Sequence, residues 1–327
     1  ASGRNGGWCS PEISVSYDEM IHRVGLEPSK AVHHAMKDTI DQVEAAVARH
    51  GIDAHVDRDG VLFVARGGHQ VKALQHLQEE MVRLGDPDFV RWLEPGEAAE
   101  LVKVDNTWGA LFSEPFAAVH PGRLVRGLAR AVERLGATIH EHTAVTGYDL
   151  APKAALHTAA GSVRADVVVL AGEAYLSQLP RHKREIMPIY SQILLTEPLT
   201  AAQRDEIGWR SRFVMQSKRL TVDYLQITRD DRIVFGGRGS TYEWGSAIRP
   251  EMDCVEETSR NLRAHFAEFF PTLADEVAFS HCWGGPVGVH RDWMPSFSYD
   301  RATGLAKAGG YAGEGVAASN LAGRVLA

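Results

Sequence analysis

The most constraining feature of the sequence is a cluster of small residues close to its C-terminal end. Residues 309–315 read Gly-Gly-Tyr-Ala-Gly-Glu-Gly, and a stretch with helical spacing of apolar side chains follows up to residue 327. Glycine lets a backbone approach a ligand closely, and the first turn of a helix presents N–H groups that have no intrahelical partner. The cluster predicts a helix whose start faces a flat ligand with polar edges. The alternative is a glycine-rich turn before an ordinary packed helix.

Two further motifs precede this segment. The chain begins with Ser2-Gly3-Arg4-Asn5-Gly6-Gly7, and Trp283-Gly284-Gly285-Pro286-Val287 is followed by Arg291-Asp292-Trp293-Met294-Pro295. In this order, the three motifs resemble those of the FAD-dependent oxidoreductases of the D-amino-acid oxidase superfamily, in its gamma-glutamylputrescine oxidase-like branch. The resemblance extends over most of the chain and is diffuse between residues 10 and 115.

The resemblance implies an α/β fold built on a FAD-binding domain of the glutathione-reductase type. This domain would be discontinuous, with residues 1–50, 120–185 and 283–327, and a mixed-sheet substrate or cap domain of residues 51–119 and 186–282 would be inserted into it. A length of 327 residues is sufficient for two domains.

The opening unit of such enzymes has no counterpart in the sequence. That unit is a strand, a Gly-x-Gly-x-x-Gly turn and a helix, with an acidic residue about 20 positions further on. The nearest candidate, residues 236–242, lacks the third glycine and is interpreted as a strand end. Because the chain also starts at Ala1, we expect an N-terminally truncated fragment without its first βαβ unit. The alternative is a protein that lost its pyrophosphate site.

Composition narrows the class of protein. Hydrophobic residues make up 44% of the chain and charged residues 24%, with a formal net charge of −7. These values fit a soluble globular protein and argue against a nucleic-acid partner, and no apolar run is long enough to span a membrane. We therefore expect a cytoplasmic protein. Cys9, Cys254 and Cys282 are scattered; they indicate neither a disulfide framework nor a metal site, and suit a reducing compartment.

Apolar periodicity and turn signals predict the secondary structure. Asp59-Gly60 predicts a hairpin within residues 55–64, and a second hairpin is expected to turn near residues 161–162. The apolar run 165–171 is typical of a buried parallel strand beside a cofactor crevice. Helices are expected at 28–47, 71–84, 97–101, 121–135, 250–270 and 316–326, and further strands at 138–145, 189–195, 220–228 and 232–236.

The resemblance also implies which residues contact FAD. Arg4 and Asn5 would stabilise the negative charge of the reduced flavin. Glu173 stands where the family often has Thr or Asn, and a carboxylate beside a pyrophosphate is unfavourable. Either its side chain points away, or the match to the family is loose here. The full predicted set is Ser2, Gly3, Arg4, Asn5, Gly6, Gly7, Val145, Ala171, Gly172, Gly284, Gly310, Tyr311, Gly313, Glu314, Gly315 and Val316.

Candidate substrate-binding residues are Tyr224, Gln226, Trp244 and Trp283. Related enzymes often hold a substrate carboxylate with an arginine on such a strand, and Gln226 stands at the corresponding place. This favours an amine, or a longer modified amine, over a plain amino acid. His140 and His142 would share one face of a strand, which is insufficient for a metal site, so no metal is expected. Covalent attachment of flavin through Cys282 is considered and disfavoured.

The resemblance implies oxidation of an amine C–N bond: hydride passes to flavin N5, and the imine is hydrolysed to a carbonyl product. Oxygen or another acceptor reoxidises the flavin, and no catalytic residue is named because the cofactor carries the chemistry. Three alternatives stay open: an oxidase or dehydrogenase of glycine, sarcosine or D-amino acids; an amine dehydrogenase that passes electrons to a protein or quinone; and a non-catalytic FAD-scaffold binding protein.

Overall fold

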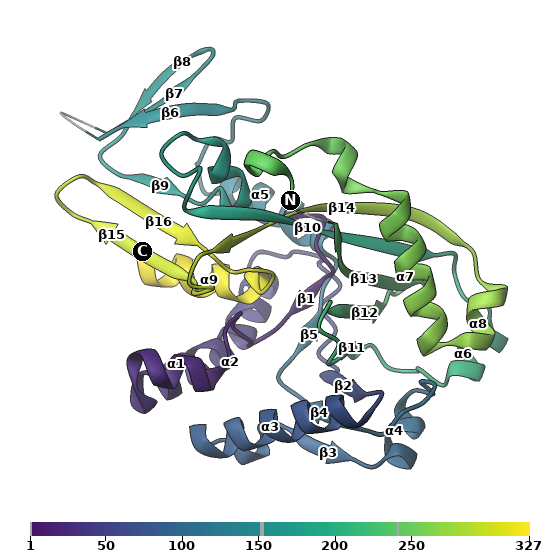
Figure 1. Cartoon of the computed structure of the whole chain (residues 1–327). Helices are drawn as coiled ribbons and strands as arrows, with labels where there is room; N and C mark the ends of the chain where they lie inside the picture. Colours follow the sequence, from purple (N-terminus) through teal and green to yellow (C-terminus); the bar gives the residue numbers. More distant parts are fainter. Residues whose placement is uncertain (1, 151–153, 241) are drawn as a thin grey trace.

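A large mixed sheet organises the molecule. The computed structural model describes residues 2–150, 154–240 and 242–327 (Figure 1), and its eight-stranded sheet has the order β14-β10-β13-β12-β11-β2-β4-β3. The β11–β2 pair is parallel and joins two sequence ranges that are far apart. The strands are β2 (Val61–Ala65), β3 (Arg91–Leu93), β4 (Gly109–Ser113), β10 (Ile186–Thr196), β11 (Val214–Ser217), β12 (Asp223–Ile227), β13 (Ile233–Ser240) and β14 (Phe279–His290).

Helices cover this sheet through apolar side chains. Helix α7 (Glu256–Phe269) packs Leu262 and Phe266 against Phe235 of β13, in a core that also holds the buried Trp209. Helix α3 (Gly68–Leu84) closes a second core over β2 and β4. Shorter helices complete this part: α4 (Pro95–Leu101), α6 (Ala201–Ile207) and α8 (Pro271–Glu276), with 3-10 turns η1 (Pro87–Phe89), η3 (Trp244–Ser246) and η4 (Pro250–Asp253).

The remaining elements include three smaller sheets (Figure 1). Strand β9 (Val168–Leu170) pairs in parallel with β16 (Leu305–Gly309), which pairs with β15 (Ser296–Asp300). Helix α2 (Leu26–Arg49) packs on the C-terminal helix α9 (Gly315–Leu326). The other elements are β1 (Trp8–Cys9), α1 (Tyr17–Val24), β5 (Ala117–Ala118), α5 (Pro121–Arg134), β6 (Val145–Asp149), β7 (Ala155–Thr158), β8 (Gly161–Arg164) and η2 (Glu173–Gln178).

Most predicted helices are present, but some strands differ from the expectation. The prediction of a hairpin around Asp59-Gly60 is wrong. The carbonyl of Gly60 accepts from the N–H of Val214, and its N–H donates to the carbonyl oxygen of Phe116. Strand β2 therefore pairs with β11 and β4. The strand at 138–145 is also wrong: only Val145 belongs to a strand, and residues 137–144 are exposed. His140 and His142 therefore do not share a strand face. The hairpin near 161–162 is confirmed as β7–β8.

Two further expectations need correction. The run 165–171 forms a parallel strand, but Val169 is 54% exposed while Val168 and Leu170 are buried, so the strand is buried on one face in this structure. The helix at 250–270 begins only at Glu256, because residues 250–253 form a separate 3-10 turn. Of the candidate dinucleotide motif, residues 236–240 lie within β13, and residue 241 lies outside the described residues.

The cysteine interpretation was wrong as well. Cys254 and Cys282 form a disulfide across 28 residues of sequence, while Cys9 is a buried free thiol. The pairing depends on the path of the chain over β14, which cysteine spacing alone does not reveal. The domain division stays a prediction, and its boundary at residue 283 falls inside β14. Within the described residues, no helix is both long and apolar enough to cross a bilayer.

Candidate active site

A cavity of about 160 Å³ lies on one face of the large sheet. The N-terminal loop, strands β10, β12 and β14, and the start of α9 form its walls. The described residues that line it are Arg4, Asn5, Gly6, Trp8, Ile189, Tyr190, Ser191, Ile193, Gln216, Val222, Tyr224, Gly285, Pro286, Val287, Ala312, Gly313, Glu314 and Val316.

The Ser2–Gly7 loop is shaped from within by Asn5. Its side-chain Nδ2 donates to the carbonyl oxygen of Ser2 at 2.8 Å, and its Oδ1 accepts from the N–H of Gly7 at 2.9 Å. Gly7 has a φ of +74°, a conformation that side chains rarely adopt. Both polar ends of the Asn5 amide are therefore engaged in holding the turn.

Two side chains from the sheet hold the loop from outside. Gln226 Nε2 donates to the carbonyl oxygen of Gly6 at 2.5 Å, and Trp283 Nε1 donates to that of Arg4 at 2.9 Å. Both residues were candidates for substrate binding. The structure places them against the loop, where they line a neighbouring cavity of about 750 Å³ on the other side of Arg4.

Tyr224 explains why the loop needs glycine. A Cβ on Gly6 would collide with the ring of Tyr224, and a Cβ on Gly236 would collide with the same ring. The Tyr224 hydroxyl lies 2.8 Å from Ser191 Oγ, and either group can donate. The ring thus fits between two glycine backbones, with its polar end on β10, and lines the cavity.

Arg4 is fixed at the cavity edge by an acidic partner. Its Nη1 donates to Asp253 Oδ2 at 2.6 Å, and the guanidinium is partly buried. Partial burial alone would lower the pKa of Arg4, but the hydrogen bond and negative charge of Asp253 outweigh it, and the pKa is raised. Arg4 stays charged, and its charge is compensated at this edge.

The C-terminal turn brings the start of α9 to the cavity. Gly310, Ala312 and Gly313 all have positive φ, at +78°, +47° and +115°. Glu314 makes no side-chain cap on the helix, and its Oε2 accepts from Ser10 Oγ at 2.5 Å. A Cβ on Gly313 would enter open space, so this wall is flat because the residue has no side chain. The turn thus leaves the first N–H groups of α9 without a capping side chain.

The structure shows how Glu173 is accommodated. Its carboxylate accepts from the N–H of Gly288 at 2.9 Å and from that of Tyr311 at 3.2 Å. Burial raises the pKa of Glu173, although these backbone hydrogen bonds oppose the shift. The side chain thus ties β14 to the C-terminal turn. Ala171 and Gly172 directly precede it, between β9 and η2.

Several predicted residues lie elsewhere. Val145 is in the separate β6-β7-β8 sheet, and Trp244 is 93% exposed; neither lines the cavity. Gly310 lines an adjacent cavity with Glu173, and Gly3 lines the one beside Arg4. The backbone of Gly284 packs against that of Asp253, and the ring of Tyr311 lies near that of Phe297. Gly315 is the first residue of α9, and the carbonyl oxygen of Ser2 accepts from the Asn5 side chain. The sulfur of Cys282 is bonded to Cys254.

Sequence reasoning missed several wall residues. Ile189, Ser191 and Ile193 alternate along β10, a period of two that identifies one strand face. Gln216 of the wall and Asp253, the partner of Arg4, carry no such signal, because their positions depend on pairing with distant segments.

The walls fit a flat cofactor with polar edges. Gly6, Gly285 and Gly313 present backbone instead of side chains, and an uncapped helix start supplies N–H groups and the positive end of its dipole. Comparison with protein families decides which cofactor this is: a family model described as "FAD dependent oxidoreductase" matches residues 1–327. The chain belongs to this family. FAD is its cofactor, and Arg4–Gly6, Gly285–Val287 and Ala312–Val316 would hold it.

Several known proteins are similar to this chain in sequence or in fold. The chain is 28% identical over 329 residues to gamma-glutamylputrescine oxidoreductase of Escherichia coli (strain K12), covering 100% of this chain and 74% of that protein. Glycine oxidase from Geobacillus kaustophilus matches with a TM-score of 0.78 at 20% identity, covering 100% of this chain and 83% of that chain. Iminodiacetate oxidase from Chelativorans sp. BNC1 matches with a TM-score of 0.74 at 19% identity, covering 100% and 84%. The two structures share the fold of this FAD-dependent oxidoreductase.

Proposed function

We propose that this FAD-dependent oxidoreductase oxidises a CH–NH or CH–NH2 group of an amine whose oxidised carbon bears no carboxylate, and that it works in the cytoplasm. When bound, FAD accepts the hydride from the carbon that bears the nitrogen. The chain contributes the cavity that orients the amine and excludes water, and the imine product is hydrolysed to a carbonyl compound.

The charge of the cavity wall carries this proposal. Among the described residues that line it, Arg4 is the one basic side chain, and Asp253 already pairs with it at 2.6 Å. A carboxylate recognised by arginine needs a guanidinium that is free to form a bidentate pair. Gln226 does not replace it, because its amide donates to the Gly6 carbonyl.

The other polar groups of the wall suit an amine. Tyr190, Ser191 and Tyr224 supply hydroxyl groups to the wall. Hydroxyl oxygens accept hydrogen bonds from the N–H groups of an amine. The name of the relative from Escherichia coli, gamma-glutamylputrescine oxidoreductase, supports a polyamine-like or acylated amine.

The test uses the FAD-loaded protein and two substrate panels under anaerobic conditions. We expect acylated and free polyamines to bleach the flavin faster than glycine, sarcosine or D-amino acids do. Fast bleaching by the amino acids, without bleaching by amines, would overturn the substrate assignment. Bleaching without peroxide after air is admitted would identify a dehydrogenase. Stable flavin absorbance with every compound would favour a non-catalytic FAD-binding protein.

A further inference from the structure

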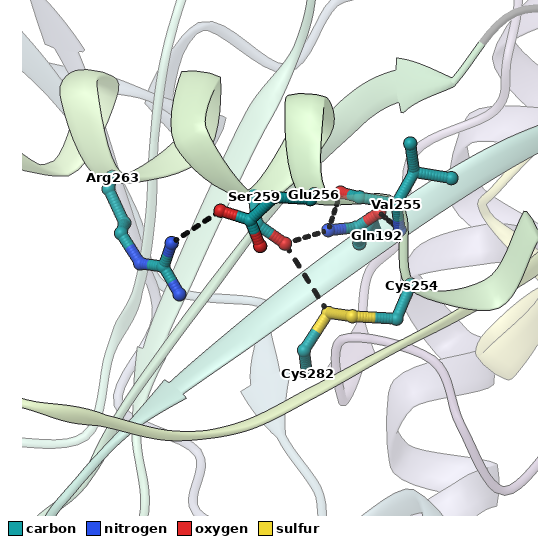
Figure 2. The surroundings of a disulfide bond; sticks show 7 residues. All are labelled: Gln192, Cys254, Val255, Glu256, Ser259, Arg263 and Cys282. Carbon is teal, nitrogen blue, oxygen red and sulfur yellow. Dashed lines mark hydrogen bonds and ion pairs between the residues drawn. A yellow bond between two sulfur atoms is a disulfide. The ribbon is translucent and has the colours of Figure 1, made fainter.

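The disulfide between Cys254 and Cys282 connects two segments next to the cavity (Figure 2). Cys254 follows the η4 turn and is exposed, while Cys282 lies in β14 and is half-buried. An exposed disulfide is open to attack by a thiolate, in contrast to one enclosed in a core. Cys254 is therefore the more exposed partner of the pair toward a small dithiol.

Each of the two cysteines is the sequence neighbour of a residue that binds Arg4. Asp253, beside Cys254, accepts from the Arg4 guanidinium at 2.6 Å. Trp283, beside Cys282, donates to the Arg4 carbonyl at 2.9 Å. The disulfide thus fixes the distance between the two groups that hold the side chain and the backbone of the same loop residue.

The segment that carries Asp253 has separate anchors on either side. Tyr190 Oη accepts from the N–H of Arg249 at 2.9 Å, and Gln192 Oε1 accepts from the N–H of Val255 at 2.8 Å. Gln192 also donates to Ser259 at 2.7 Å, as Figure 2 shows. The start of α7 is therefore held independently of the disulfide. Reduction would free residues 250–254 locally while the helix stays in place.

We propose that Cys254–Cys282 is a thiol–disulfide exchange site that positions Arg4, so that reduction of this bond loosens the Ser2–Gly7 loop beside the FAD pocket. The consequence for flavin rests on the proposed function, but the movement of the loop does not. In a reducing compartment, a disulfide of this kind is typical of a redox-sensing role.

A dithiol can reduce the Cys254–Cys282 disulfide by thiol–disulfide exchange. One thiolate of the dithiol attacks a sulfur of the pair, which forms a mixed disulfide and releases the other cysteine as a thiolate that takes up a proton. The second thiol of the reductant, as its thiolate, then attacks the mixed disulfide and releases the second cysteine. Two electrons and two protons pass to the protein, and the reductant becomes a cyclic disulfide.

Cys9 provides an internal reference. It is 1% exposed, and burial raises the pKa of its thiol to about 12. A thiol-specific alkylating reagent applied to the native protein should therefore leave Cys9 unlabelled, since the thiolate is the reactive form. Any labelling that follows mild reduction reports on Cys254 and Cys282.

The experiment treats the native chain with dithiothreitol, alkylates it and counts labels by mass spectrometry. We expect none before reduction and labels on Cys254 and Cys282 afterwards. Hydrogen exchange of the same samples should become about tenfold faster or more in residues 2–7 and 250–254, and stay unchanged in 256–269, because opening frees the loop from a charge-assisted hydrogen bond. Resistance of the native disulfide to excess reductant, or reduction without faster exchange in residues 2–7, would overturn the proposal.

Variants separate the disulfide from its effect. The double variant Cys254→Ser/Cys282→Ser should show fast exchange in residues 2–7 with and without reductant. In Asp253→Asn, which keeps the disulfide, reduction should change the exchange of the loop less than in the wild type. An equal response in Asp253→Asn would contradict positioning through Asp253. Flavin absorbance after reduction reports the consequence for FAD, and an unchanged spectrum with a loosened loop would count against that consequence alone.

Discussion

The indole N–H of Trp283 donates to the carbonyl oxygen of Arg4, 279 residues earlier in the chain. Together with the bond from Gln226 to Gly6, it ties the N-terminal loop to two strands of the large sheet. The loop and the sheet thus form one wall of the cavity, and substitutions that release the loop should act on the cofactor before they act on the substrate.

Gly6→Ala should weaken FAD binding by about tenfold or more. The added Cβ would collide with the ring of Tyr224, so the loop must shift, and overpacking of this kind costs about 1–3 kcal/mol. FAD titration followed by flavin fluorescence measures the effect. Gly96→Ala is the matched control, because a Cβ there meets no atom within 4 Å. Equal FAD affinity in Gly6→Ala and the wild type would contradict the packing argument.

Gln226→Leu should lower FAD affinity while the Michaelis constant for an amine substrate stays within about twofold of the wild-type value. The variant removes the donor to the Gly6 carbonyl, and a hydrogen bond of this kind contributes about 0.5–1.5 kcal/mol. Saturating FAD should restore turnover. A large rise in the Michaelis constant with unchanged FAD affinity would instead identify Gln226 as a substrate contact.

Gly315→Val should lose FAD, whereas Gly323→Ala in the same helix should retain it. A Cβ on Gly315 would lie 3.2 Å from the ring of Tyr311 at the turn that faces the cavity, while a Cβ on Gly323 meets nothing within 4 Å. The ratio of flavin to protein absorbance after purification decides the matter. Full flavin content in Gly315→Val would refute the prediction.

Glu173→Gln should gain stability relative to the wild type as pH rises. Burial raises the pKa of Glu173 in the folded state, so its stabilising contribution is full below the unfolded pKa, about 4.3, and is lost as pH rises through the folded value. The neutral variant lacks this loss. Urea unfolding measures the unfolding free energy of both proteins at pH 4 and pH 7. The value for Glu173→Gln minus that for the wild type should be larger at pH 7 than at pH 4. A shift in the opposite direction would show that the bonds to Gly288 and Tyr311 outweigh burial.

Local signals identified much of the molecule. The αL glycine after α3 and the apolar spacing of α2 and α5 gave helices that the structure contains. The Ser2–Gly7 and C-terminal motifs predicted segments that do meet at one cavity. Long-range pairing was not predictable: Gly60 turns the chain toward Phe116 and Val214, and no local pattern encodes those partners.

The roles within the site were harder to predict than its location. Gln226 and Trp283 were predicted to bind substrate, but each has a polar group directed at a backbone carbonyl of the loop. That direction depends on where residues 2–7 cross the sheet. Asp253 was not predicted, because its relation to Arg4 spans 249 residues.

The ring of Tyr224, held between Gly6 and Gly236, has a consequence for engineering this pocket. The three positions are sterically coupled, so a library that varies any one of them alone samples mainly collisions or voids. A smaller residue at position 224 would create room on two segments at once, and side chains at positions 6 and 236 become acceptable only in that background. Directed evolution toward bulkier amines should therefore randomise these three positions together and keep the Ser191 hydroxyl as a fixed reference.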